Sequence, residues 1–202
     1  MINTAPNDSM HRLTDLSYDT PVLLTERLVL RPPHRDDREE LAAIANNRQI
    51  AEMTSRMPFP YGLGDAETFI DRCIGGEHEG YVYAITQAET GHLMGFCSLE
   101  KRERSGGFEI GFWLGEAYWG AGYATEAASA LVDQAFRSTG AERVHAVCRT
   151  VNARSRNVIA KCGFAFVGLD ETDTISVGRV PVERYVLDRG SWLARKANGK
   201  PT

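Results

Sequence analysis

Residues 118–127 read YWGAGYATEA, and this stretch decides how the rest of the chain is interpreted. It follows a strand-like apolar run at 108–114 and opens into a helix-like run at 124–136. A backbone that turns from a strand into a helix over Gly120 and Gly122 leaves N–H groups directed at one point, where the helix dipole adds positive potential. The sequence therefore predicts an anion site for a phosphorylated cofactor or substrate.

The familiar glycine-rich nucleotide motifs do not fit this stretch. A dinucleotide fingerprint has Gly or Ala at its sixth position, where this chain has Thr125, and an acid at the end of the next strand, where it has Arg149. The phosphate-loop sequence Gly-Lys-Ser/Thr does not occur anywhere in the chain. A nucleotide-dependent oxidoreductase is therefore disfavoured.

Further signals lie on both sides of the glycines. The motif N-x-x-S at 152–155 leads to Gly-Phe at 163–164, while residues 25–32 read TERLVLRP and residues 109–114 read EIGFWL. The combination resembles the GNAT superfamily of acyl-CoA N-acyltransferases. Within it, the chain is similar to the RimJ/RimL-like branch, the ribosomal-protein N-terminal acetyltransferases. The resemblance covers residues 22–188.

This resemblance implies a cofactor and a set of residues that hold it. The cofactor is acetyl-CoA, used as a co-substrate, and no metal is implied. Its pantetheine and phosphates are expected against the end of the 108–114 strand, the glycine turn and the helix that starts near Asn152. The residues assigned to cofactor binding are Phe112, Trp113, Leu114, Trp119, Gly120, Ala121, Gly122, Tyr123, Ala124, Thr125, Asn152, Asn157 and Lys161.

Two positions depart from the superfamily pattern. Ala117 stands where many members begin the pyrophosphate loop with Gln or Arg, which is acceptable if backbone amides hold the phosphates. Ile159 stands where many members carry a tyrosine general acid, so a tyrosine acid at this position is excluded.

The segment after the 143–149 strand supports two interpretations. Asn152 is equally well interpreted as the N-cap of a short helix at 153–161 or as a ligand of the pantetheine or substrate. The four basic residues between positions 149 and 161 are each typical of a solvated helix face. Together they predict attraction for the phosphates of coenzyme A.

Three side chains are candidates for proton transfer. Glu109 is an acid inside an apolar strand, where alternation also allows it simply to face outward, and the resemblance implies a carboxylate that lines the amine site. Glu183, on a later strand, is the second candidate for that base. The resemblance makes Ser155 the proton donor to the departing thiolate, although an exposed helix serine is the ordinary interpretation. Glu126 falls in the first turn of the central helix, where an acid stabilises the dipole.

The chemistry favours an α-amine as the acceptor. An α-amine with a pKa of about 8 is about one tenth neutral at pH 7, which costs about 1.4 kcal/mol, whereas a lysine amine costs about 4.6 kcal/mol. The first interpretation is an N-acetyltransferase for the α-amine of a protein or peptide, and the second is the same reaction on an amino acid, a polyamine or a drug. The apolar segment 53–61 should border the acceptor and argues mildly against a polyamine. A non-catalytic acyl-CoA-binding module is the third, disfavoured by Glu109 and Ser155.

Composition limits the partners and the compartment. The 202 residues are 43% apolar and 25% charged, which suits one globular domain. The net charge of −4 argues against direct nucleic-acid binding, and no apolar run approaches the ~18 residues of a membrane span. The chain has neither a signal-peptide pattern nor a C-x-x-C pair, so a cytoplasmic location is expected. An amine acceptor is the expected partner, and the chain is expected to be a monomer or a homodimer.

The expected fold class is mixed α/β (α+β), as a single GNAT-like domain at 21–190. Its mostly antiparallel sheet of about seven strands carries helices on both faces. Residues 1–20 are expected to be a mobile leader, and residues 191–202 a polar tail. Helices are predicted at 36–46, from a cap at Asp65, at 124–136 and at 153–161; strands are predicted at 25–31, 81–86, 92–99, 108–114, 143–149, 165–168 and 182–187, with a turn at 170–173.

Overall fold

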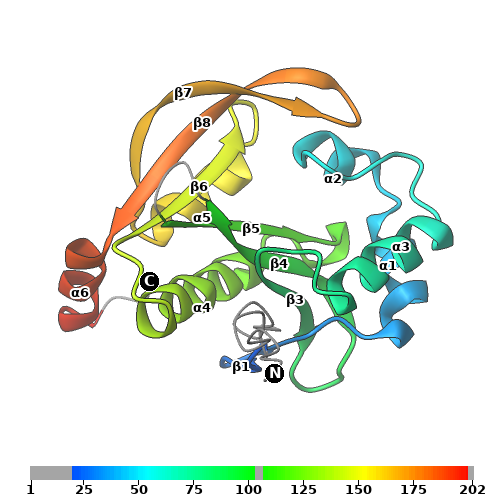
Figure 1. The fold of residues 1–202 in the computed structure, drawn as a ribbon, viewed down its shortest axis with the longest axis horizontal. Helices are drawn as coiled ribbons and strands as arrows, with labels where there is room; N and C mark the ends of the chain where they lie inside the picture. Colours follow the sequence, from blue (N-terminus) through cyan, green and yellow to red (C-terminus); the bar gives the residue numbers. More distant parts are fainter. Residues whose placement is uncertain (1–19, 103–106, 200–202) are drawn as a thin grey trace, which may run out of the picture.

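An eight-stranded sheet forms the centre of the molecule, in a computed structural model that describes residues 20–102 and 107–199 (Figure 1). The strands are β1 (Leu23–Leu24), β2 (Leu28–Arg31), β3 (Gly80–Gln87), β4 (Leu93–Arg102), β5 (Gly107–Leu114), β6 (Arg143–Arg149), β7 (Ala165–Thr174) and β8 (Gly178–Asp188). Their order in the sheet is β1-β2-β3-β4-β5-β6-β8-β7, and every neighbouring pair is antiparallel except β5 and β6.

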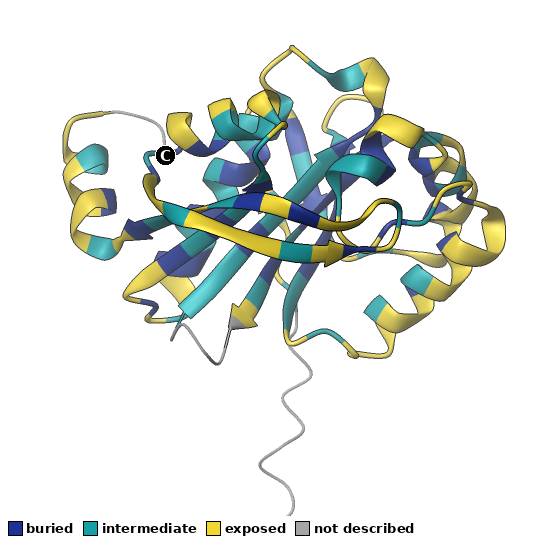
Figure 2. Ribbon diagram, turned by 90° about the horizontal axis from the view of Figure 1, so that it is seen from above, coloured by how far each residue is buried: buried dark blue, intermediate teal, exposed yellow. Residues whose placement is uncertain are grey.

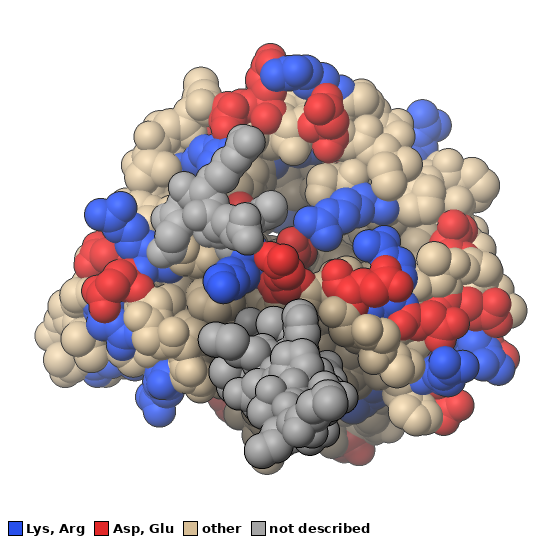
Figure 3. Space-filling view, in the orientation of Figure 1, with Lys and Arg blue, Asp and Glu red and all other residues tan. Residues whose placement is uncertain are grey.

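The helices lie between these strands and after the last of them. They are η1 (Arg35–Asp37), α1 (Arg38–Ala45), α2 (Arg48–Met53), α3 (Leu63–Ile74), η2 (Glu116–Tyr118), α4 (Tyr123–Ser138), α5 (Ala153–Lys161) and α6 (Arg189–Ala197). Within the described ranges, none of these helices has the length and apolar composition that crossing a bilayer requires. On the face drawn in Figure 3, basic and acidic side chains are mixed.

One face of the sheet is covered by α4, and this interface holds the larger part of the core. The helix forms because its apolar residues recur on one side, and fully burying one leucine or phenylalanine contributes about 1.5–3 kcal/mol. Figure 2 shows the buried positions where helices and strands meet. The stripe that α4 buries consists of Ala127, Ala128, Leu131, Val132, Ala135 and Phe136, each at most 1% exposed.

The opposite face of the sheet is covered by α1, α2 and α3. Leu41, Ile50 and Ile70, one from each helix, are buried in a second cluster. Ala84 on β3 and Phe96 on β4 supply the sheet side of that cluster. The predicted fold class, a mixed and mostly antiparallel sheet with helices on both faces, is therefore confirmed. The sheet has eight strands rather than the predicted number of about seven, and one of the eight is the two-residue β1.

The first helical region differs in detail from the prediction. A short helix, α2, precedes the irregular 53–61 segment, and the Asn47 side chain begins it by accepting the backbone N–H of Gln49 at 2.9 Å. Asp65 does not cap α3, because the helix already starts at Leu63. Its carboxylate instead accepts the backbone N–H of Gly62 at 2.8 Å, from within the first turn.

The C-terminal segment is not a simple polar tail. Residues 189–197 form α6, and Trp192 within it is only 6% exposed. The indole stacks on Phe136 of α4 with ring centroids 5.1 Å apart, and its N–H donates to Asp133 at 2.8 Å. This tryptophan, together with the ion pair of Lys196 and Asp133 at 2.6 Å, anchors a helix whose other residues are mostly polar. The expected leader lies almost entirely outside the described residues.

The turn between the last two strands is also later than predicted. Residues 170–173 lie inside β7, which pairs with β8 as far as Thr174 and Gly178. Most residues of β7 are exposed on both faces of the strand. Its polar side chains therefore remain in solvent, and the strand continues through residues 170–173. Ion pairs to β8 hold two of these positions instead, Arg184 with Asp170 at 2.6 Å and Arg179 with Glu171 at 2.8 Å.

Candidate active site

A gap in the sheet between β5 and β6 creates the main cleft of the described structure. The two parallel strands pair only at Phe108–Val144, Glu109–His145 and Ile110–Ala146. Both strands continue beyond this point, to Leu114 and Arg149, without pairing to each other. A cleft of about 1050 Å³ opens there, and the unpaired ends of both strands form its walls.

Peptide groups of β5 face this cleft. The N–H of Gly115 donates to Met94 on the β4 side at 2.8 Å. Because the peptide groups of successive strand residues point to opposite edges, those of Phe112 and Leu114 point toward β6 and the cleft. The carbonyl of Leu114 accepts the indole N–H of Trp119 at 2.7 Å. The N–H of Phe112 therefore presents a backbone donor in the cleft wall.

The glycine turn closes one end of the cleft. Gly120 and Gly122 have φ values of +80° and +88°, a region that favours glycine. Gly122 is the N-cap of α4 and offers no side chain to bind the first N–H groups of the helix. The N–H groups of Tyr123 and Ala124 therefore point out of the helix end, where they can bind an anion.

The structure brings the sequence-predicted residues together around this one cleft. Ala121 and Glu183 are the exceptions, because neither lines the cleft; the carbonyl of Ala121 instead accepts a hydrogen bond from Arg27 at 3.0 Å. The predicted residues in the lining are Glu109, Phe112, Trp113, Leu114, Trp119, Gly120, Gly122, Tyr123, Ala124, Thr125, Asn152, Ser155, Asn157 and Lys161.

The start of α5 places Ser155 at the cleft. The side-chain oxygen of Asn152 accepts the backbone N–H of Ser155 at 3.0 Å, so Asn152 caps the helix and also lines the cleft. Cys148 on β6 lines the same cleft. Burial, followed by the negative charge of Glu183, raises the pKa of Cys148 to about 11, so this thiol is protonated at neutral pH.

The basic residues at 149–161 are engaged in different ways. Arg149 donates to the carbonyl of Glu52 on α2. Arg154 lies over the ring of Trp119, 4.5 Å from its centroid. Arg156 forms an ion pair with Glu183, so its charge is directed away from the expected phosphate role. The predicted attraction for phosphates therefore depends on the other three cations, Arg149, Arg154 and Lys161, which all line the cleft.

Glu109 lies at the point where the gap begins. Strand alternation puts its side chain on the face opposite Ile110, which is buried against α4. Glu100 stands directly across from it on β4 and binds Arg56 at 2.8 Å. His145 is its partner on β6; burial lowers the pKa of this imidazole, while the charge of Glu109 acts to raise it.

Gly111 follows Glu109 in the cleft wall, and the structure explains why this strand position has no side chain. A Cβ atom there would lie 2.9 Å from the hydroxyl oxygen of Ser98 on β4. A larger residue at this position would therefore collide with Ser98.

Glu183, the second candidate base, does not line the cleft. Its carboxylate accepts hydrogen bonds from Arg156 at 2.8 and 2.9 Å and from the hydroxyl of Tyr185 at 2.6 Å. The hydrogen bond from Arg156, followed by that from Tyr185, lowers the pKa of Glu183. Such a carboxylate is a weak proton acceptor at neutral pH.

Sequence reasoning missed Arg27 as part of this site. Arg27 precedes β2, yet its guanidinium lies 4.4 Å from the ring centroid of Tyr123 and binds the carboxylate of Glu126. The sequence shows Arg27 in the TER of residues 25–27 and Glu126 in the TEA of residues 125–127. It does not show that these two segments are in contact. Among the described residues, no cluster of three or more His, Cys, Asp or Glu side chains could hold a metal ion.

Comparison with known proteins places the chain in a family. Residues 27–165 match the acetyltransferase (GNAT) domain. A relative from Aspergillus fumigatus, an FsC-acetyl coenzyme A-N(2)-transacetylase, is 36% identical over 187 residues, which cover 86% of this chain and 78% of the relative. The N-acetyltransferase p20 of Bacillus licheniformis is 29% identical over 150 residues, covering 73% of this chain and 84% of p20.

Solved structures show the same fold. Mycobacterium smegmatis RimJ in complex with CoA-disulfide has a TM-score of 0.69 and 18% identity, over 86% of this chain and 90% of RimJ. The ribosomal-protein-S5-alanine acetyltransferase of Vibrio fischeri has a TM-score of 0.71 and 15% identity, over 85% of this chain and 98% of that enzyme. The chain therefore belongs to the GNAT acetyltransferase family, whose acyl donor is acetyl-CoA.

Proposed function

We propose that this acetyltransferase moves the acetyl group of acetyl-CoA to the α-amine of a protein or peptide N-terminus by direct attack on the thioester. The observation that carries the proposal is that one cleft contains the glycine turn at the start of α4 and the Glu109 carboxylate. The first feature suits a phosphorylated donor and the second suits an amine.

The donor is expected to lie along β5 and the glycine turn. Its pantetheine amides pair with the peptide groups of Phe112 and Leu114 that face the cleft. Its pyrophosphate binds the N–H groups of Tyr123 and Ala124, and the cation of Lys161 lies on the same cleft. A β5 N–H also stabilises the oxyanion that forms when the thioester carbonyl is attacked.

The acceptor amine must lose a proton to react. In this proposal Glu109 accepts that proton, directly or through one water molecule, as the amine nitrogen bonds to the thioester carbon. Glu109 is favoured over Glu183 because it lines the cleft and Glu183 does not, and because Arg156 and Tyr185 already bind the Glu183 carboxylate.

The leaving group is the CoA thiolate, released when the carbon–sulfur bond breaks. Ser155 is proposed to donate its hydroxyl proton to this sulfur and to recover a proton from solvent. The cap from Asn152 holds Ser155 at the cleft wall, which supports this role. Ile159, at the position where relatives often have tyrosine, is 1% exposed and points to the core.

The acceptor end of the cleft is formed by the segment between α2 and α3. Met57, Pro58 and Tyr61 line it, and Arg56 there is paired with Glu100. An α-amine suits a cleft with this largely apolar wall because its low pKa means that a modest base, such as one carboxylate, is enough to remove its proton. The acceptor named for the Vibrio fischeri fold neighbour, a ribosomal-protein alanine, is of this class.

A small-molecule amine is the second candidate acceptor. It is favoured by the fungal relative, whose name describes transfer to N(2) of FsC and which is 36% identical to this chain. A peptide-library acetylation screen, run beside a panel of amino acids, polyamines and FsC, separates the two. Acetylation of peptide α-amines supports the first proposal, whereas turnover of the small amines alone replaces it with the second.

A further inference from the structure

Arg27, just before β2, contacts the glycine turn from outside the cleft. Its Nη1 donates to the carbonyl of Ala121 at 3.0 Å, and its guanidinium lies 4.4 Å from the ring centroid of Tyr123. These two contacts lie on either side of Gly122 in the sequence. A Cβ atom at Gly122 would lie 3.4 Å from Nη2 of Arg27, so the guanidinium is directly beside the turn.

Arg27 is held in this position by Glu126 in the first turn of α4. The carboxylate of Glu126 accepts Nε of Arg27 at 2.7 Å, the backbone N–H of Arg27 at 2.8 Å and the hydroxyl of Thr25 at 2.6 Å. Partial burial alone would raise the pKa of Glu126, but the hydrogen bonds from Thr25 and Arg27 lower it. Glu126 is therefore ionised at neutral pH and does more than stabilise the helix dipole.

The glycine turn is costly to order, and an external contact offsets part of that cost. Gly120 and Gly122 lose more conformational entropy on ordering than any other residue type, and no side chain caps the helix that follows. The carboxylate of Glu126, one turn into α4, would also repel an incoming pyrophosphate if its charge were not balanced. Arg27 meets both needs, because it fixes the Ala121 carbonyl and neutralises Glu126.

We propose that Arg27 is a positioning residue for the acyl donor. Held by Thr25 and Glu126, it orders the glycine turn so that the N–H groups of the turn and of α4 converge on the pyrophosphate of CoA, and it balances the Glu126 charge. This inference rests on the donor site proposed above. It gives residues 25–27 a function in cofactor binding rather than only in starting the sheet.

The test compares donors with and without a pyrophosphate. In Arg27→Met, the Kd for CoA measured by calorimetry should rise about tenfold, and the KM for acetyl-CoA should rise with it. The kcat at saturating acetyl-CoA should stay within about twofold of wild type. S-acetylpantetheine has no pyrophosphate, so its kcat/KM should also stay within about twofold. Purely structural damage would instead raise the Kd for CoA and lower both kcat and the kcat/KM for S-acetylpantetheine together.

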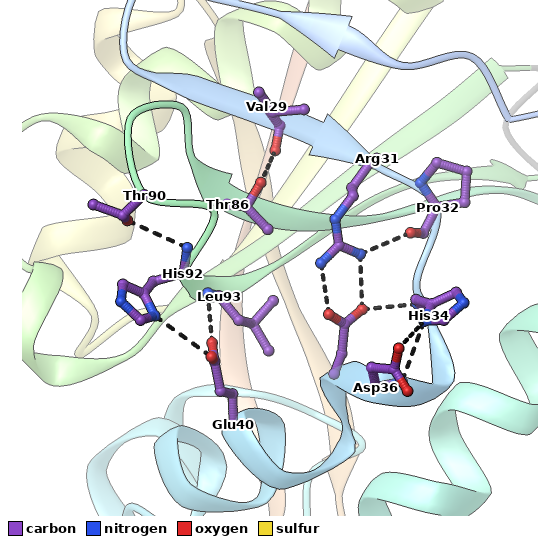
Figure 4. Close-up of polar contacts among 11 residues, drawn as sticks. Val29, Arg31, Pro32, His34, Asp36, Glu40, Thr86, Thr90, His92 and Leu93 are labelled. Carbon is purple, nitrogen blue, oxygen red and sulfur yellow. Dashed lines mark hydrogen bonds and ion pairs between the residues drawn. The ribbon is translucent and has the colours of Figure 1, made fainter.

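Arg31→Met is the matched control. Arg31 also binds a carboxylate in a fork, with Nη1 2.8 Å from Oδ2 and Nη2 2.6 Å from Oδ1 of Asp37 (Figure 4). Its contacts go to Pro32 and Asp37, not to the glycine turn. Its removal disrupts an equivalent ion pair near the other end of β2, so the Kd for CoA should not change.

The outcomes separate this inference from the proposed donor site. If Gly122→Val weakens CoA binding but folded Arg27→Met does not, the positioning role is wrong and the donor site stands. If neither variant changes the Kd for CoA, the donor site itself is wrong. If Arg27→Met reduces kcat/KM for S-acetylpantetheine as much as for acetyl-CoA, Arg27 acts on the fold rather than on the pyrophosphate.

Discussion

The guanidinium of Arg156 on α5 holds the carboxylate of Glu183 on β8 through two hydrogen bonds, of 2.8 Å from Nε and 2.9 Å from Nη2. The side chain of Glu183 is only 15% exposed, and its pKa is lowered by these contacts. An acid that two donors of one arginine already occupy is poorly suited to take a proton from an amine. Glu109 is therefore the better candidate for the base.

Glu109→Gln should lower turnover. The amide keeps the shape of the side chain but cannot accept a proton, so kcat should fall about a hundredfold and the acidic limb of the pH–rate profile should flatten. The Kd for acetyl-CoA should stay within about twofold. Steady-state kinetics with calorimetry checks both. Glu183→Gln is the matched control; if that variant loses kcat and Glu109→Gln does not, the two roles must be exchanged.

Ser155→Ala should reduce turnover only modestly. A thiol with a pKa of about 8.5 is already a fair leaving group, so loss of the serine proton should cost about tenfold to a hundredfold in kcat, or about 1.4–2.7 kcal/mol. The Kd for acetyl-CoA should change little. Wild-type turnover would mean that solvent supplies the proton, and a loss confined to cofactor affinity would make Ser155 a binding residue.

Gly122→Val should weaken acetyl-CoA binding by about tenfold or more, or about 1.4 kcal/mol, because valine strains the φ of +88° and its Cβ would lie 3.4 Å from Nη2 of Arg27, so the turn that holds the pyrophosphate is displaced. Gly140→Val is the matched control. Gly140 also has a positive φ, of +66°, and follows the far end of α4. Both variants carry backbone strain, so both should lose stability, and only Gly122→Val should lose calorimetric affinity. Equal affinities in the two folded variants would exclude the glycine turn as the donor site.

Trp192→Ala should destabilise the protein by about 3–5 kcal/mol, since it removes a buried indole and leaves Asp133 without that donor. The neighbouring Leu193 is 54% exposed, so Leu193→Ala should change the free energy of unfolding by less than about 0.5 kcal/mol. Urea denaturation measures both. Similar values for the two variants would show that α6 does not depend on its tryptophan.

The contacts of Glu126 predict a pH dependence of stability. Its pKa is lowered in the folded state, so its contribution is present above the ordinary glutamate pKa of 4.5 and is lost as the pH falls through the folded value. The stability difference between wild type and Glu126→Gln should therefore be constant near neutral pH and shrink in acid. A difference that grows in acid would contradict the assignment.

The elements closest to the site were predictable because their patterns are local. The apolar stripe from Ala124 to Phe136 gave α4 to within two residues, and alternation in 143–149 matched β6. The residues of the glycine turn were also predictable, since only a turn with positive φ needs two glycines there. Periodicity and backbone preference are properties of short segments, so one sequence reveals them.

The relationships between distant segments were not predictable. Nothing in the sequence shows that β5 and β6 stop pairing after Ile110 and Ala146, because register depends on both strands. The ion pair between Arg27 and Glu126 joins residues 99 positions apart, and the sequence does not indicate which of the chain's acidic residues a surface arginine binds. Helix α6 was missed because one tryptophan in a polar segment does not form a periodic pattern.

The most direct test of the central claim is mass spectrometry of peptides incubated with the protein and acetyl-CoA. The account predicts that wild-type protein adds one acetyl group to the peptide α-amine, with release of an equal amount of CoA. The same peptides should remain almost unmodified with Glu109→Gln, although that variant binds acetyl-CoA normally. Equal acetylation by wild type and Glu109→Gln, or acetylation confined to lysine side chains, would contradict it.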